Sequence, residues 1–330
     1  TQGAMVYISR GNFMEMAENL GVLIVYVAYI YKIRITKSKS IRDMVQKLKE
    51  QEGHILENAD EEIRKIYMEY AESTGKIVFF YFIVGTIATV VYFARPPIEN
   101  YLRQPETKYL IFPSWFPFDT NEHYWIAYSI QAAAGLLGYS YIVFQGTLYC
   151  SFLIFFVGQL HIMRHIFKNI THYISKFSDE TGIPYVKAQE YFVKICIKQH
   201  QQIIRSVRSL DESVKTFLLL DFATSSLQLS LLVVQLIDGT EIIERCAQLW
   251  FLLTLCYQLV FFYWNAHEII VQSTGIADAV FESDWYKLEL PVQKLLTMVI
   301  MRAQKPMSLS IGPFYEARVD AVVSLYKAIY

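Results

Sequence analysis

Cysteine, histidine and acidic side chains are the groups in this chain that could bind a metal ion or catalyse a reaction. The four cysteines are spread along the sequence, at Cys150, Cys196, Cys246 and Cys256. None of them forms a Cys-x-x-Cys pair or a spaced set with histidines, so we expect four free thiols and no metal site. The GxSxG, HExxH, Walker A and Rossmann motifs are missing. We therefore expect a protein that is not an enzyme, with no catalytic residue and no cofactor.

Polar residues inside otherwise apolar segments are the other candidates for chemistry. They are Asp221, Asn265, His267 and Glu268, and a charge buried in lipid is costly enough to need a partner. Such residues could form a polar network or an ion vestibule within the membrane. They could instead lie at the level of the membrane interface, beside partners from a neighbouring region. The sequence favours this second interpretation.

Long apolar segments must position these residues. The chain is 54% hydrophobic and 18% charged, whereas a soluble domain carries about 25% charged residues. Crossing about 30 Å of hydrocarbon takes about 20 apolar residues in a helix. The segments that fit are 12–33, 77–94, 124–163, 214–237, 247–271 and a last one, 313–330, that starts near Pro313. An all-α protein that crosses a membrane several times is therefore expected.

Other segments are too polar or too short to span. Residues 34–72 and 185–212 mix charged with apolar residues at helical spacing, so they are expected to be amphipathic helices, the first interrupted at Gly53. Residues 288–303 form a shorter amphipathic helix that packs against others. In the connection 95–122, helix formation is expected to stop at a series of prolines, namely Pro96, Pro97, Pro105, Pro113 and Pro117.

The distribution of basic residues predicts the orientation. Residues 32–76 contain ten Lys or Arg and residues 164–215 contain nine, whereas 95–122 contain three and 238–244 none. Basic connections stay preferentially in the cytoplasm. The first visible span then runs inward, which requires one earlier span for a cytoplasmic N-terminus. We expect seven spans in all, with the C-terminus outside.

Several short motifs resemble those of insect odorant receptors. The outer connection reads FPSWFPFD at 112–119, immediately before a long apolar segment. Downstream, FESDWY at 281–286 is followed by MRAQKP at 301–306. The last helix starts with Gly312-Pro313-Phe314 and VDAVVSL at 319–325. Each motif is weak alone, but together they follow the order of the family along essentially the whole chain.

The resemblance implies a seven-transmembrane odorant receptor fold. Its S2 to S6 would be the five complete apolar segments, S7a the helix at 288–303 and S7b the pore-lining span 313–330, with S1 absent. The family forms tetrameric ligand-gated, non-selective cation channels in the plasma membrane of olfactory sensory neurons. Odorant-specific subunits assemble there with a shared co-receptor, Orco, through a cytoplasmic anchor region, here about 160–213 and 272–306. Because this chain lacks the long S4–S5 connection of the co-receptor, it resembles a ligand-tuning subunit.

The resemblance also implies an odorant cavity in the outer half of the membrane, among S2, S3, S4 and S6. Small apolar volatiles would be held there mainly by buried apolar contact. Gly85 and Gly135 are expected to leave the void that the ligand fills. The candidate ligand-binding residues are Phe13, Met16, Leu20, Tyr81, Phe82, Gly85, Thr89, Tyr92, Tyr128, Gln131, Ala132, Gly135, Tyr139, Trp250, Leu253, Thr254 and Tyr257.

The last span offers a stripe of residues three and four positions apart that either faces the pore or packs on S5. The candidate pore-lining residues are Val319, Val322, Val323, Tyr326, Ile329 and Tyr330. The family's gate would lie beyond Tyr330. A gustatory receptor of the same superfamily is the main alternative. A G-protein-coupled receptor is a weaker one, because its N-terminus would lie outside and its outer connection would carry a cysteine.

Overall fold

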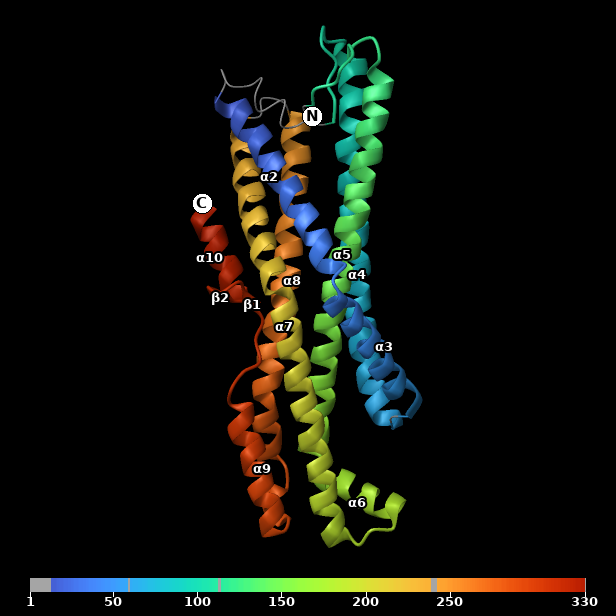
Figure 1. The fold of residues 1–330 in the computed structure, drawn as a ribbon, viewed down its shortest axis with the longest axis vertical. Coiled ribbons are helices and arrows are strands. Elements are labelled where there is room, and N and C mark those ends of the chain that lie inside the picture. The colour runs from blue at the N-terminus through green and yellow to red at the C-terminus, as the bar shows by residue number, and fades with distance from the viewer. Residues whose placement is uncertain (1–12, 59, 112–113, 239–241, 330) are drawn as a thin grey trace.

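Long helices that run along one axis make up the computed structural model, which describes residues 13–58, 60–111, 114–238 and 242–329 (Figure 1). The helices are α2 (Phe13–Thr36), α3 (Lys39–Asn58), α4 (Glu61–Arg103), α5 (Tyr124–Lys168), α6 (Ile170–Thr181), α7 (Tyr185–Asp238), α8 (Ile242–Glu282), η2 (Trp285–Lys287), α9 (Leu290–Ala303) and α10 (Val319–Ile329). Two short strands, β1 (Ser310–Ile311) and β2 (Tyr315–Glu316), complete the described part. The all-α prediction is confirmed.

Four helices in the described residues are long enough and apolar enough to cross a membrane: α4, α5, α7 and α8. They contain the spans expected at 77–94, 124–163, 214–237 and 247–271. Each helix continues well past its apolar segment. The segment 185–212, for example, is the first half of α7, so the prediction of a helix there is confirmed. The segment 12–33 corresponds to α2.

The prediction that Pro96 and Pro97 stop the helix is wrong, because α4 runs through both prolines to Arg103. A proline removes the hydrogen bond to the carbonyl four residues earlier, which for Pro97 is that of Phe93. The Tyr128 hydroxyl of α5 donates to this carbonyl instead, at 2.9 Å. A partner from the neighbouring helix thus compensates for the proline. The helix ends before Pro105, as expected.

The predicted helical region 34–72 is broken at two places, between α2 and α3 and between α3 and α4, and not at Gly53. Gly53 is inside α3, which continues to Asn58, and α4 starts at Glu61. The acidic residues Glu61 and Glu62 in the first turn of α4 suit the positive end of the helix dipole. The chain therefore turns between α3 and α4. Within α3, the helix tolerates Gly53, because one glycine lowers the stability of a helix only slightly.

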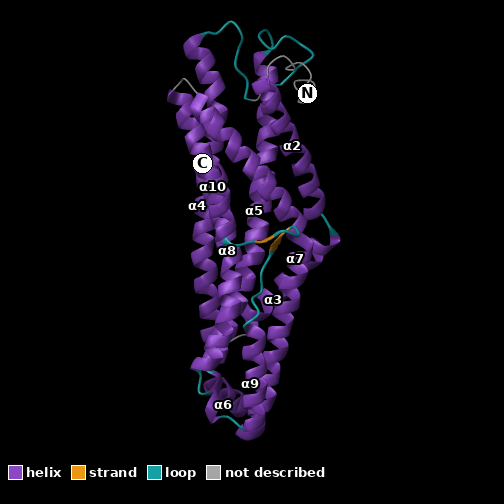
Figure 2. Ribbon diagram, turned by 90° about the vertical axis from the view of Figure 1, so that its left-hand side faces the viewer, coloured by secondary structure: helices purple, strands orange, loops and turns teal. Residues whose placement is uncertain are grey.

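The two ends of the bundle differ in content (Figures 1 and 2). The connection between α4 and α5 lies at one end, and α6 and α9 lie at the other. A large apolar core extends toward the α6 and α9 end, and it includes Phe152, Phe156, Phe167, Leu210 and Leu296. The two connections that the basic residues predict to be cytoplasmic reach toward this same end.

A short hairpin separates α9 from α10, so the helix expected from Pro313 begins only at Val319. Strands β1 and β2 pair in antiparallel fashion, with Gly312 in a left-handed conformation (φ 58°) between them. The hairpin is fixed to α7. The Gly312 N–H donates to the Lys215 carbonyl (3.0 Å), and the Asp211 carboxylate accepts from the Ser310 N–H (2.6 Å) and hydroxyl (3.2 Å).

Candidate ligand-binding site

Helices α4, α5 and α8, which carry most of the predicted ligand residues, pack side by side. Several of these residues contact residues outside the predicted set on a neighbouring helix. The Tyr139 hydroxyl lies 2.8 Å from that of Thr86, and the Tyr92 ring lies 6.3 Å from the ring of Phe251 on α8. Tyr257 makes an edge contact with Phe80 at 6.0 Å. These contacts between α4, α5 and α8 form an aromatic zone that extends along α4 from Phe80 to Tyr92.

The expectation of a void beside Gly85 and Gly135 is wrong. A Cβ atom on Gly135 would lie 2.5 Å from Cζ of Phe93, and one on Gly85 would lie 3.3 Å from the Tyr139 hydroxyl. Aromatic rings from the opposing helix fill both places. These glycines allow α4 and α5 to approach each other closely.

The other predicted residues are scattered over different environments. Gln131 is buried and Tyr128, Ala132, Thr89 and Thr254 are half-buried. The residues Phe82, Trp250 and Leu253 are exposed on the surface of the chain. The side chains of Phe13, Met16, Leu20 and Tyr81 lie outside the described residues.

A cavity of about 50 Å³ lies one helical turn deeper than the predicted set. Val78, Ile142 and Phe261 line it, each three or four residues further toward the α6 and α9 end than Tyr81, Tyr139 and Tyr257. Five helices enclose it: α2, α4, α5, α7 and α8. The full lining is Tyr29, Lys32, Val78, Ile142, Gln145, Gly146, Thr147, Tyr149, Cys150, Phe217, Asp221, Gln258, Leu259, Phe261 and Phe262. The wall is mainly apolar and aromatic, with a polar group on one side.

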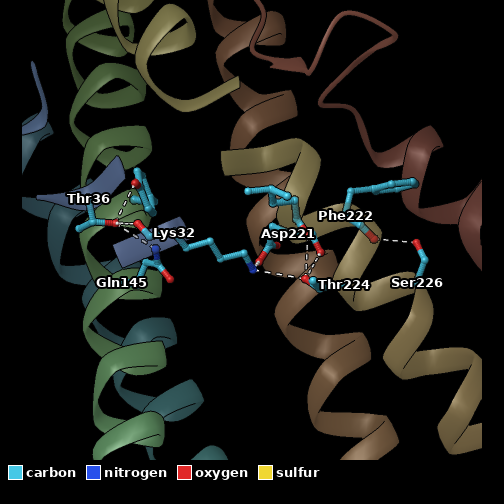
Figure 3. A network of polar contacts seen from close by, with 9 residues as sticks. Lys32, Thr36, Gln145, Asp221, Phe222, Thr224 and Ser226 are labelled. Atoms are coloured by element: carbon cyan, nitrogen blue, oxygen red, sulfur yellow. Dashed lines mark hydrogen bonds and ion pairs between the residues drawn. The ribbon is translucent and has the colours of Figure 1, made fainter. Parts of the chain in front are cut away.

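That polar group is a buried ion pair between α2 and α7 (Figure 3). Lys32 reaches across to Asp221, where its Nζ lies 2.7 Å from Oδ1, and it also donates to the Thr224 hydroxyl at 3.3 Å. The Lys32 side chain is 2% exposed and that of Asp221 19%. The ammonium group also lies 5.0 Å from the centroid of the Tyr29 ring and 5.4 Å from that of Phe217. The negative faces of these rings suit a cation.

A second set of hydrogen bonds ties the same turn of α2 to α5. The Thr36 hydroxyl accepts a hydrogen bond from the Gln145 amide at 3.0 Å and lies 3.2 Å from the Tyr149 hydroxyl. The Tyr149 ring in turn stacks on Phe217 of α7, with centroids 4.2 Å apart. Helices α2, α5 and α7 are therefore joined by one continuous group of polar and aromatic contacts beside the cavity.

The sequence pointed to Asp221 but not to its partner. Lys32 was counted among the basic residues of a cytoplasmic connection, whereas the structure buries it. For Asp221 a polar network is observed, because its partner is Lys32 of α2, whereas its level in the membrane stays a prediction. On α8, the Asn265 amide donates to the Phe261 carbonyl at 2.8 Å, and Glu268 accepts from Gln272. The burial of Lys32 could have been suspected only from its position inside the expected span 12–33, where a charge needs a partner.

Some members of the predicted pore-lining stripe pack against neighbouring helices, and one is exposed. Val322 is buried, and the Tyr326 hydroxyl donates to the Cys256 carbonyl of α8 at 3.0 Å. Val319 is half-buried, while Val323 is exposed. The side chain of Ile329 and all of Tyr330 lie outside the described residues. The stripe was expected either to face the pore or to pack on S5, which is the apolar half of α7. Its buried members pack, and they contact α8 as well as α7.

Near the α6 and α9 end, His200 of α7 is buried, and its Nε2 has no hydrogen-bond partner. Burial, together with the positive charge of Arg302, lowers the pKa of His200 to about 4. Burial likewise raises the pKa of the Cys196 thiol to about 12, so it is protonated at neutral pH. Among the residues with described positions, no three His, Cys, Asp or Glu side chains gather as a metal site would require.

Comparison with known proteins gives a family match over most of the chain. A family model described as 7tm Odorant receptor matches residues 12–330. Odorant receptor Or2 of Anopheles gambiae is 31% identical over 138 residues, 42% of this chain and 36% of that protein. Odorant receptor 10 of Aedes albopictus is 28% identical over 187 residues, 56% and 49% of the two chains. The odorant receptor coreceptor of Ooceraea biroi is 24% identical over 182 residues, 51% and 38%. The chain spans about half or less of the length of these relatives.

Solved structures show the same fold. The insect olfactory receptor OR5 from Machilis hrabei superposes with a TM-score of 0.79, at 14% identity, over 99% of this chain and 82% of that chain. Its complex with eugenol gives a TM-score of 0.72, at 15% identity, over 95% and 77%. At such low identity the likeness concerns the arrangement of helices alone.

Proposed function

This chain belongs to the 7tm odorant receptor family, and from that membership we propose that it is the ligand-tuning subunit of a heterotetrameric, odorant-gated, non-selective cation channel formed with Orco. The observation that carries the proposal is the cavity enclosed by α2, α4, α5, α7 and α8. Four of these helices, α2, α4, α5 and α8, are the ones expected to bind odorants, and α7 completes the wall of the cavity. A ligand bound there touches the helix that holds the base of α10.

The ligand is a small, mainly apolar volatile. The cavity wall offers Tyr29, Ile142, Leu259 and Phe262, and apolar contact contributes about 25 cal/mol for each Å² buried. A volume of about 50 Å³ has room for only a few water molecules. Binding therefore accompanies a separation of the helices, and the ligand shifts gating only by its preference for that opened arrangement.

The route from the cavity to the pore helix runs along α7. Asp221 faces the cavity, while Asp211 and Lys215, one to three turns away on the same helix, bind the hairpin before α10. A displacement of α7 relative to α2 therefore moves the base of α10. Among the predicted pore-lining residues, Val323 has an exposed side chain, and we expect it to face the pore.

The subunit sits in the plasma membrane of olfactory sensory neurons, with its N-terminus in the cytoplasm. The excess of Lys and Arg in 32–76 and 164–215 supports this orientation. Only α6 and short turns lie between α5 and α7, which supports a ligand-tuning subunit over the co-receptor. Similarity to the coreceptor of Ooceraea biroi over 182 residues supports a common subunit architecture for assembly.

Current recording tests the proposal. The full-length chain is expressed in oocytes with and without Orco, and currents are recorded against a panel of volatile odorants. We expect inward cation current from the pair and not from the chain alone. Odorant responses that need a G protein and proceed without channel current from the pair would refute the channel assignment.

A matched pair of variants on α5 tests the position of the ligand. Ile142→Trp fills the cavity, whereas Leu137→Trp adds the same ring to a side chain that is 73% exposed. Losing some 60 Å² of apolar contact is expected to raise the half-maximal odorant concentration about tenfold for Ile142→Trp. Leu137→Trp should leave it unchanged. Equal effects of the two variants, at equal surface amounts, would place the ligand elsewhere.

A further inference from the structure

A second cavity, of about 100 Å³, lies at the end of α4 opposite to α6 and α9. It is hollowed between the last turns of α4 and the connection that follows this helix. Its floor carries two charges, Arg95 and Glu99, and its wall is apolar, with Pro96, Leu110 and Ile111. Charged groups beside an apolar wall are the combination that orients a small ligand.

The two charges form an ion pair in which the carboxylate is the more buried group. The Arg95 Nε lies 2.9 Å from Glu99 Oε1, and the Glu99 side chain is only 8% exposed. A carboxylate so buried requires a partner, and the i, i+4 spacing on α4 supplies it. The helix keeps this spacing because it continues through Pro96 and Pro97. The continuation of α4 past the prolines is thus what places both charges in the cavity.

The wall of the cavity is held in position before any ligand arrives. The Asn100 amide makes two hydrogen bonds to the backbone of Tyr109: its Nδ2 donates to the carbonyl at 2.9 Å, and its Oδ1 accepts from the N–H at 2.7 Å. Ile111, two residues further on, is buried. A preformed wall lowers the entropic cost of binding, because the protein segment need not be ordered when the ligand arrives.

Tyr92 connects this cavity to the aromatic zone below it. Its side chain lines the cavity, and its ring contacts Phe251 of α8 at 6.3 Å. Both Tyr92 and Tyr109 are exposed, so the cavity is open to the outer side.

We propose that this outer cavity is a subsite that selects neutral odorants bearing a hydroxyl group, with the hydroxyl bridging Arg95 and Glu99 and the carbon chain lying against Pro96, Leu110 and Ile111. The inference rests on the proposed odorant-receptor function. A hydroxyl both donates and accepts, so it serves the carboxylate and the guanidinium without adding charge. A carboxylic acid or an amine would instead add a further charge to a buried pair whose two charges already balance, which is costly.

Alcohols and their methyl ethers test this subsite, because the ether keeps the chain and the acceptor but lacks the donor. The probes are hexanol, octanol and decanol with the corresponding ethers, applied to oocytes that express the full-length chain with Orco. Glu99→Gln removes the charged acceptor and preserves shape. Glu106→Gln, at an exposed glutamate of the same connection, is the control. We expect Glu99→Gln to lower sensitivity to alcohols about tenfold relative to ethers, whereas the control has no effect.

A second variant guards against a folding defect in the first. Leu110→Trp fills the cavity without touching the charges, and it is expected to remove the preference for alcohols while responses to other odorants and surface amount persist. An alcohol-to-ether ratio that is unchanged in both variants overturns the subsite, as does a receptor that responds to the wider panel but to no alcohol. Failure of the proposed function looks different, because the pair would then carry no odorant-evoked current at all.

Discussion

Breaking the ion pair between Lys32 and Asp221 is expected to destabilise the receptor strongly. At 2.7 Å and an effective dielectric constant of about 20, the two charges attract by about 6 kcal/mol. Much of this offsets the loss of hydration of both groups. Removing one partner leaves the other buried and unpaired, which costs about 3–5 kcal/mol. Because Asp221 is 19% exposed and lies beside the cavity, water can reach it, so we expect about 3 kcal/mol for Lys32→Met.

A double-mutant cycle isolates the interaction. Lys32→Met and Asp221→Leu each remove one charge, and the double variant removes both and leaves an apolar contact. We expect the double variant to be more stable than either single one, measured by thermal denaturation of the detergent-solubilised receptor. Lys65→Met, at an exposed pair whose nitrogen and oxygen are 3.9 Å apart, is the control and should change nothing. Losses that simply add in the double variant would show that the two residues do not stabilise each other.

Three further predictions concern backbone and titration. Gly135→Ala should lower thermal stability by about 1 kcal/mol, because the added Cβ would overlap Phe93, whereas Gly138→Ala meets nothing within 4 Å and should not. Gly312→Ala places a side chain at φ 58° and should cost about 1 kcal/mol. It should also reduce odorant-evoked current at unchanged surface amount. His200, whose pKa is lowered from 6.5 to about 4, stays neutral in the fold while the unfolded chain takes up a proton. Stability should therefore fall as pH drops from 6.5 towards 4, and His200→Gln should flatten that profile in denaturation scans.

The sequence by itself determined the elements that depend on local composition. Apolar segments of membrane-crossing length lie within α4, α5, α7 and α8. In lipid the backbone N–H and C=O groups have no water to bind, and a helix lets one segment satisfy all of them itself. The motifs at 112–119, 281–286 and 301–306 identified the family, and the family match over residues 12–330 confirms it. The amphipathic pattern of 185–212 likewise predicted the extension of α7 beyond its apolar half.

Only the tertiary structure decided where helices pair and where space remains. Lys32 and Asp221 are 189 positions apart, and no local pattern in the sequence pairs them. The course of α4 through Pro97 depends on a hydroxyl from α5, which no local pattern contains. Whether a glycine opens a void or admits a ring depends on the opposing helix, and at Gly135 that helix supplies Phe93. Cavities and buried charges are properties of contacts between distant segments, so their positions become known only once the helices are packed.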